Sequence, residues 1–210
     1  KIANNMQSES IVYKILSYPL FYYISQKLIA KKGSRQKFVD NYLKPFPGMK
    51  IVDFGCGPGS IIEYLPEQVE YVGVDAEKNY IDSAINKYGE IGKFICEDIL
   101  SFSPKEVNYF DIAIAIGLLH HLNDEESKKL IEAANKVLKP GGCLVTIDNI
   151  YIKNQSFIAR FLISKDRGKN VRTLDQYLRI GQTVFPKIEY QIIHDMLRVP
   201  YTHIIMTMTT

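Results

Sequence analysis

A short acidic and glycine-rich stretch holds the residue types in this chain that are best suited to chemistry. A strand-type run ends with Asp53, glycines follow at positions 55, 57 and 59, and an amphipathic segment comes next. Strand, tight turn and helix in this order are typical of the start of a βαβ unit. Glycine lets a ligand approach the backbone, and open α/β sheets bind ligands at the carboxyl ends of their strands. The stretch therefore predicts a site for a nucleoside-type cofactor.

A second acidic residue follows at the spacing that such a site requires. The apolar run 69–75 predicts a second strand that ends in Asp75, 22 positions after Asp53. Nucleotide-binding βαβ units place an acid here to accept hydrogen bonds from ribose hydroxyls. The alternative role is an N-cap of the helix predicted at 77–88. We expect Asp75 to bind the ribose.

The residues around the glycines distinguish between cofactors. A dinucleotide site needs a further glycine where Ser60 stands, and Asp53 would repel a pyrophosphate but suits a cationic amino group. The pattern Val-Asp-Phe-Gly-Cys-Gly-Pro-Gly at 52–59 resembles motif I of the class I S-adenosylmethionine-dependent methyltransferases. This resemblance implies S-adenosyl-L-methionine as the cofactor and S-adenosyl-L-homocysteine as its product.

Three later stretches resemble the same family in the same order. They are the run that ends at Asp98 and Ile99, the apolar strand 109–117 with its following Leu-Leu-His-His-Leu, and Leu-Lys-Pro-Gly-Gly at 138–142. The resemblance implies that Asp98 and Ile99 meet the adenine, although Asp98 alone could also be a solvated turn residue. The implied cofactor-binding residues are Asp53, Gly55, Cys56, Gly57, Gly59, Asp75, Ala76, Asp98, Ile99, Ile116, Gly117 and Leu118.

Two adjacent histidines, His120 and His121, are the candidate catalytic residues. Methyl transfer is an in-line displacement in which the protein aligns the reacting atoms, and a general base is needed only if the acceptor carries a proton. Histidine can accept a proton near neutral pH. The alternative is a structural or cofactor-positioning role for the pair. His194, Asp148 and Tyr151 are rival bases from later in the chain.

The C-terminal third is basic and is the expected acceptor side. Residues 151–200 hold nine lysines and arginines against four acidic residues. Within the polar run 165–172, Arg167 and Arg172 are candidate forks for a carboxylate or phosphate on an anionic acceptor. The alternative is a solvated loop in which Asp166 pairs with an arginine. Further candidate acceptor-binding residues are Tyr18, Arg35 and Tyr151.

Length and composition set the outer bounds. The 210 residues predict one domain, with a helical cap over 1–45, a cofactor-binding core over 46–150 and an acceptor-side region with a closing hairpin over 151–210. A net charge of +3 is too small to indicate general nucleic-acid binding. Apolar runs are too short to span a membrane, and the three cysteines show no metal-ligand spacing. We expect no metal, a cytoplasmic location, and a monomer or homodimer.

The expected fold is a three-layer, Rossmann-like α/β domain. Its sheet has seven mostly parallel strands, and a C-terminal antiparallel hairpin closes it. The expected function is methyl transfer to a small molecule. Protein methylation and a cofactor-binding partner subunit without activity remain alternatives. A nucleic-acid methyltransferase is disfavoured because Gly117-Leu118-Leu119-His120 stands where an (Asp/Asn)-Pro-Pro-Tyr motif is expected. A nicotinamide-dependent dehydrogenase would need a glycine at the position where this chain has Ser60.

Overall fold

Strands and helices alternate along the part of the chain that the structure describes. The structure is a computed structural model, and it describes residues 30–99, 101, 107–166 and 168–210. The helical elements are α3 (Ser34–Phe38), η1 (Val39–Leu43), η2 (Ser60–Tyr64), α4 (Lys78–Tyr88), η3 (Leu119–His121), α5 (Asp124–Val137), α6 (Phe157–Ser164) and α7 (Leu174–Gln182). The strands are β1 (Lys50–Phe54), β2 (Glu70–Asp75), β3 (Lys93–Cys96), β4 (Phe110–Ile116), β5 (Leu138–Tyr151), β6 (Arg172–Thr173), β7 (Lys187–Ile193) and β8 (His203–Thr209).

One mixed sheet organises the domain. Its strand order is β3-β2-β1-β4-β5-β8-β7. The first five strands run parallel to one another, whereas β8 pairs antiparallel with both β5 and β7. This order confirms the predicted parallel sheet with an antiparallel C-terminal hairpin. The structure adds β6, a two-residue strand that pairs parallel with β5 and that no sequence pattern indicated.

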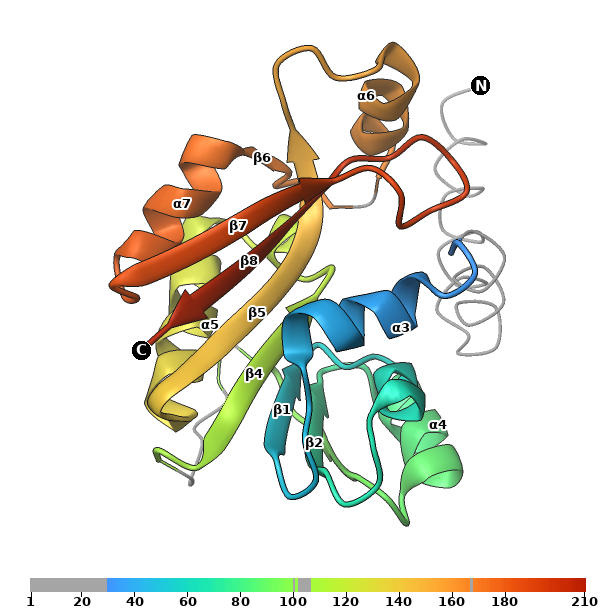
Figure 1. Ribbon diagram of the computed structural model, residues 1–210, viewed down its shortest axis with the longest axis vertical. Helices are drawn as coiled ribbons and strands as arrows, with labels where there is room; N and C mark the ends of the chain where they lie inside the picture. Colours follow the sequence, from blue (N-terminus) through green and yellow to red (C-terminus); the bar gives the residue numbers. More distant parts are fainter. Residues whose placement is uncertain (1–29, 100, 102–106, 167) are drawn as a thin grey trace, which may run out of the picture.

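Helices cover both faces of the sheet and make three layers (Figure 1). On one face α5 and α7 pack over a core that contains Leu130 and Tyr177. On the other face α3 and η1 bring Phe38 and Leu43 against strand residues. Neighbouring residues of the parallel strands therefore enter different cores, because successive side chains of a strand point to opposite faces. This explains the nearly continuous apolar character of β1, β4 and β5.

Local signals fix where the main helices begin. Asn123 caps α5, because its side chain accepts the backbone N–H of Glu126 and the Glu126 carboxylate accepts the backbone N–H of Asn123. The first turn of α5 is also acidic, which complements the helix dipole. Thr173 begins α7 in a similar capping box with Gln176. The segments before α5 and α7 therefore end at the capping residues Asn123 and Thr173.

Two elements differ from their predicted form. The segment after the glycine turn is the 3-10 helix η2 rather than the first turns of an α-helix. Strand β5 begins at Leu138 and includes the Lys-Pro-Gly-Gly stretch, where proline and glycine would favour a turn that ends the preceding helix. The pairing of β4 with β5 shifts register between Phe110 and Ile112, so the ladder tolerates these residues as an irregularity.

Candidate active site

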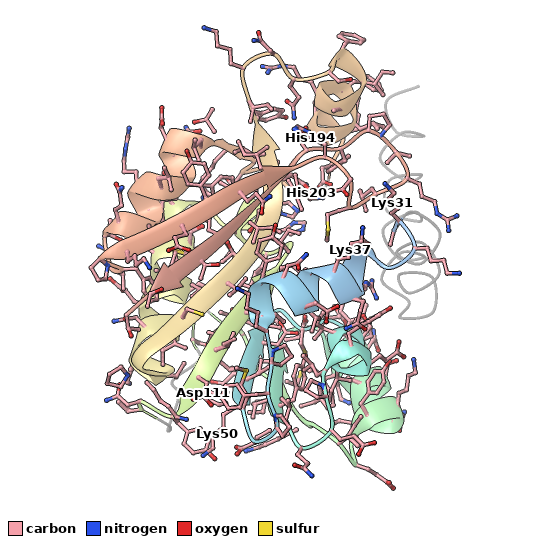
Figure 2. The ribbon with its side chains drawn as sticks, in the orientation of Figure 1. Lys31, Lys37, Lys50, Asp111, His194 and His203 are labelled. Atoms are coloured by element: carbon pink, nitrogen blue, oxygen red, sulfur yellow. The ribbon has the colours of Figure 1, made fainter. Side chains whose placement is uncertain are left out.

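The predicted cofactor residues lie at the carboxyl edge of the parallel strands. Asp53 and Asp75 are at the ends of β1 and β2, and Gly117 follows β4. His203 starts β8 opposite Asn149 near the end of β5, so it belongs to the same edge. Figure 2 shows Lys50 and Asp111 at the other end of the sheet, far from His203. The site is therefore built on one edge only.

The glycine turn adopts a backbone that only glycine accepts readily. Gly55, Gly57 and Gly59 have φ values of 71°, 54° and 71°. A Cβ on Gly59 would lie 2.6 Å from the Phe94 ring, so packing on β3 also requires a glycine there. A Cβ on Gly55 would lie 3.1 Å from Leu118. The turn is thus held between β3 and the segment that follows β4.

Asp53 is a buried carboxyl group at the start of this turn. The Tyr71 hydroxyl donates to its Oδ2 at 2.6 Å, whereas Oδ1 has no hydrogen-bond partner among the described residues. Burial raises the pKa of Asp53 to about 7; the Tyr71 hydrogen bond opposes the shift, and the charge of Asp75 adds to it. An unpartnered buried carboxylate oxygen is costly. A cationic amino group at Oδ1 would satisfy it.

Asp75 supports the turn as well as facing the site. Its Oδ2 accepts the backbone N–H of Gly57 at 2.8 Å, and its Oδ1 accepts that of Glu77 at 2.8 Å. The bond to Glu77, immediately before α4, gives Asp75 part of the helix-start role that was the alternative to ribose binding. Each oxygen keeps a lone pair for a ribose hydroxyl. Both roles fit the same side chain.

The remaining predicted cofactor residues lie around these two acids. Cys56 packs against Gly73, and burial raises its thiol pKa, so the thiol stays neutral. The backbone N–H of Gly117 donates to Ile147 at 2.7 Å, and Gly117 takes a φ of 65°. Asp98 is exposed just after β3. The other predicted residues, Ala76, Ile99, Ile116 and Leu118, follow or end the same strands and are exposed or partly buried.

His120 sits in a buried ionic network. Its Nδ1 lies 2.8 Å from Asp148 Oδ1, and its Nε2 lies 3.4 Å from Asp166 Oδ1. Burial disfavours the imidazolium charge, but hydrogen bonds to the two carboxylates outweigh it and raise the pKa of His120 to about 9. His120 therefore holds a proton at neutral pH in this arrangement. This disfavours the expectation that it acts as a free general base.

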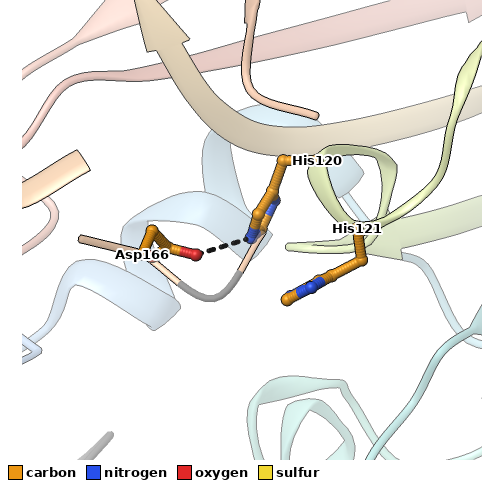
Figure 3. A group of neighbouring side chains, drawn as sticks. All are labelled: His120, His121 and Asp166. Atoms are coloured by element: carbon orange, nitrogen blue, oxygen red, sulfur yellow. Dashed lines mark ion pairs between the residues drawn. The ribbon is translucent and has the colours of Figure 1, made fainter. Parts of the chain in front are cut away.

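His121, Tyr201 and His203 surround this network. The rings of His120 and His121 lie 4.3 Å apart between centroids (Figure 3). The Tyr201 hydroxyl donates to Asp166 Oδ2 at 2.7 Å. Burial, with the charge of His120, lowers the pKa of His203 to about 4, so His203 is neutral. Sequence reasoning missed Tyr201, His203 and the pairing of Asp166 with His120, because their partners lie far away in the chain.

Arg172 does not have the role predicted from sequence. Its side chain is buried, and all five N–H donors are used within the protein. The acceptors are Asp124 Oδ1, the carbonyls of Leu119, Leu122 and Asn170, and Ser127 Oγ. No donor is left for an acceptor anion. The expectation that Arg172 binds a carboxylate or phosphate is therefore corrected: it fastens the loop that carries the histidine pair.

The other predicted acceptor residues are scattered. Arg35 Nη1 donates to Ser60 Oγ at 3.0 Å, which places it beside the cofactor turn. Tyr151 ends β5, and its ring lies 5.2 Å from the Arg160 guanidinium. Tyr18 and Arg167 lie outside the described residues. The structure thus does not bring Arg35 and Tyr151 together with Arg172 as one anion site.

Comparison with known proteins finds methyltransferases that are similar to this chain. Residues 51–142 match the family model described as a methyltransferase domain. A phosphoethanolamine N-methyltransferase of Triticum aestivum is 33% identical over 140 residues, which cover 59% of this chain and 26% of that protein. A ubiquinone biosynthesis O-methyltransferase of Idiomarina loihiensis is 30% identical over 51% of this chain and 45% of that protein. The relatives also include tRNA methyltransferases.

Solved structures share the fold at low sequence identity. A phosphoethanolamine N-methyltransferase 2 of Haemonchus contortus, in complex with phosphomonomethylethanolamine and S-adenosylhomocysteine, has a TM-score of 0.67 at 15% identity. The match covers 84% of this chain and 52% of that one. The chain spans less than half the length of the Triticum and Idiomarina relatives. No helix among the described residues is long and apolar enough to cross a membrane.

Proposed function

We propose that the chain is a class I S-adenosylmethionine-dependent methyltransferase that transfers a methyl group from S-adenosyl-L-methionine to a small-molecule acceptor. One observation carries the cofactor half of this proposal. The buried Asp53 leaves Oδ1 without a partner among the described residues, beside a turn of three left-handed glycines. The α-amino group of S-adenosylmethionine is positively charged and has N–H donors, so it can be the partner that this oxygen lacks.

The chain's own residues would then hold the cofactor along the strand ends. Asp53 would accept the amino group, Asp75 the ribose hydroxyls, and Asp98 with Ile99 would flank the adenine. The bound cofactor supplies an electrophilic methyl group on sulfur. The protein aligns the acceptor with that methyl and limits water, which is its contribution to an in-line displacement.

The histidine pair supports an acceptor site beyond Gly117. His120 follows Gly117 by three residues, and the network around it is the part of this edge that the cofactor acids do not use. Its groups, Asp148, Asp166 and Tyr201, come from β5 and the C-terminal third. We propose that this cluster acts on the acceptor rather than on the cofactor.

A small acceptor is favoured over a macromolecule by two observations. The net charge is only +3, and no (Asp/Asn)-Pro-Pro-Tyr sequence follows β4. The Triticum and Haemonchus proteins are named for phosphoethanolamine, and the Idiomarina protein for ubiquinone biosynthesis. Phosphorylated amines and phenols are therefore the first acceptors to test, with tRNA as the main alternative.

Calorimetric titration with S-adenosylmethionine and S-adenosylhomocysteine tests the cofactor. We expect both to bind wild type, and Asp53→Asn to weaken binding of each at least tenfold. Asp82→Asn, on the exposed side of α4, is the matched control and should bind as wild type. Failure of both ligands to bind folded protein would overturn the proposal.

Transfer of a labelled methyl group to phosphorylated amines, phenols, bulk tRNA and protein then tests the acceptor class. We expect label in a small molecule. Label found only in tRNA or protein would show that the small-molecule part is wrong while leaving the cofactor intact.

A further inference from the structure

We propose that His120, His121 and Asp166 form a binding site for a divalent transition-metal ion, with Zn²⁺ as the representative. Each residue offers one ligand atom, and the three atoms lie within 4.8 Å of one another. Figure 3 shows the two rings and the carboxylate converging from η3 and from the loop after α6. No spacing in the sequence indicated this, because 45 residues separate Asp166 from His121.

The distances suit a metal of this size. Ligands about 2.0–2.1 Å from a tetrahedral zinc ion lie about 3.3 Å from one another. His120 Nε2 and Asp166 Oδ1 are 3.4 Å apart, which already matches. The separations that involve His121 are at most 4.8 Å, so only a small shift of this ring separates the group from a zinc geometry.

A second layer of groups orients the ligands as metal sites require. Metal-binding histidines almost always give their other ring N–H to a carboxylate, a carbonyl or water, and Asp148 lies 2.8 Å from Nδ1 of His120. This bond leaves Nε2 facing Asp166, and a bound ion would take the place of the proton that His120 holds there in the free protein. The Asp166 carboxylate is itself held by the Tyr201 hydroxyl at 2.7 Å and by the backbone N–H of Gly168 at 2.9 Å.

The ligand set selects the metal class. Two imidazoles and one carboxylate suit Zn²⁺ and its neighbours in the first transition row, whereas Mg²⁺ and Ca²⁺ prefer oxygen ligands throughout. Asp148 and Asp166 also bring two carboxylates to His120, and a doubly charged ion would balance them. Three protein ligands leave a coordination position open, as in catalytic zinc sites.

The use of that open position rests on the proposed methyltransferase function, whereas the metal site itself does not. An acceptor with a hydroxyl or phosphate oxygen could occupy it. A divalent ion lowers the pKa of a hydroxyl that it binds, so it would supply what was expected of a general base. It would also provide the positive charge for an anionic acceptor that Arg172 cannot provide.

Direct metal binding tests the inference. Protein freed of metal by a chelator is titrated with Zn²⁺ against a chromophoric indicator, and its metal content is measured after gel filtration. Wild type should retain one Zn²⁺ per chain. His121→Ala should weaken binding by at least about tenfold, since it removes a ligand. His194→Ala changes an exposed histidine outside the cluster and is the matched control; it should bind as wild type.

Two further variants separate the loss of a ligand from the loss of its support. Asp166→Asn keeps the side-chain shape but removes the charged ligand, and Tyr201→Phe removes only the hydroxyl that holds Asp166. We expect a large loss of Zn²⁺ affinity in the first and a smaller loss in the second. Equal Zn²⁺ binding by wild type, His121→Ala and Asp166→Asn would overturn the site and assign the zinc to groups elsewhere, such as the exposed Cys96.

The same proteins are titrated with S-adenosylmethionine. Cofactor binding without zinc binding would remove the metal site and leave the proposed function standing. Zinc binding without cofactor binding would support the metal site and overturn the proposed function.

Discussion

The proposed cofactor half and the proposed acceptor half of this edge are built by different means. The cofactor half uses side chains within a few residues of strands β1 to β4, each at a spacing that the βαβ repeat imposes. The acceptor half joins His120 to Asp148 and Asp166, and Asp166 to Tyr201, across 28 to 46 residues of chain. Turn geometry fixes the first half, whereas long-range hydrogen bonds between charged groups fix the second. Substitutions should therefore separate the two halves.

The largest expected effect is in the acceptor half. Arg172→Met removes five donors, so the carbonyls of Leu119 and Leu122 and the Ser127 hydroxyl each lose a hydrogen bond. Because Asp124 is exposed, the loss comes from the buried hydrogen bonds, and we expect about 3 kcal/mol in the free energy of unfolding, measured by urea denaturation. Arg179→Met on the exposed face of α7 should change it by less than about 0.5 kcal/mol. A similar small loss for Arg172→Met would refute the fastening role.

The next effect lies in the glycine turn. Gly59→Ala puts a Cβ into a left-handed residue and 2.6 Å from Phe94, whereas Gly141→Ala has the strain without a neighbour within 4 Å. Strain alone costs about 1–2 kcal/mol. We expect Gly59→Ala to lose at least about 1 kcal/mol more than Gly141→Ala, since overpacking adds to strain. Equal losses of stability for the two variants in thermal unfolding would show that the Phe94 ring moves aside at no measurable cost.

A smaller effect, in pH dependence, distinguishes Asp53. Its pKa of about 7 in the free protein must fall when a cationic amino group binds, so binding releases a proton. The association constant for S-adenosylmethionine should therefore rise up to about tenfold per pH unit below pH 7 and level off above it. Asp53→Asn should abolish this rise in calorimetric titrations. Persistence of the slope in the variant would assign it to another group.

The smallest effect concerns Arg35. Because it bonds to Ser60 in η2, Arg35→Ala should weaken cofactor binding only a few-fold, about the value of one hydrogen bond. The KM for the acceptor should stay unchanged. A raised KM for the acceptor with unchanged cofactor binding would instead assign Arg35 to the acceptor half, as predicted from the sequence.

This contrast explains what the sequence could predict. Apolar periodicity and strand-end acids placed β1, β2, β4 and the C-terminal hairpin, because those patterns are local. The prediction that Arg172 binds an anionic acceptor was wrong, because a basic loop has the same composition whether its arginine faces solvent or five internal acceptors. Likewise, no spacing reveals that Asp166 meets His120, since that contact exists only after α6 has packed.

The position of β8 has a consequence for the order in which the fold is completed. β8 follows β7 in the sequence but lies between β5 and β7 in the sheet. During synthesis, β7 therefore leaves the ribosome with no strand to join, and it must wait for residues 203–209. The same residues bring His203 to the site edge. Nascent chains that lack them would present a β5 edge open to pairing with other chains, so this region is where co-translational misassembly would begin.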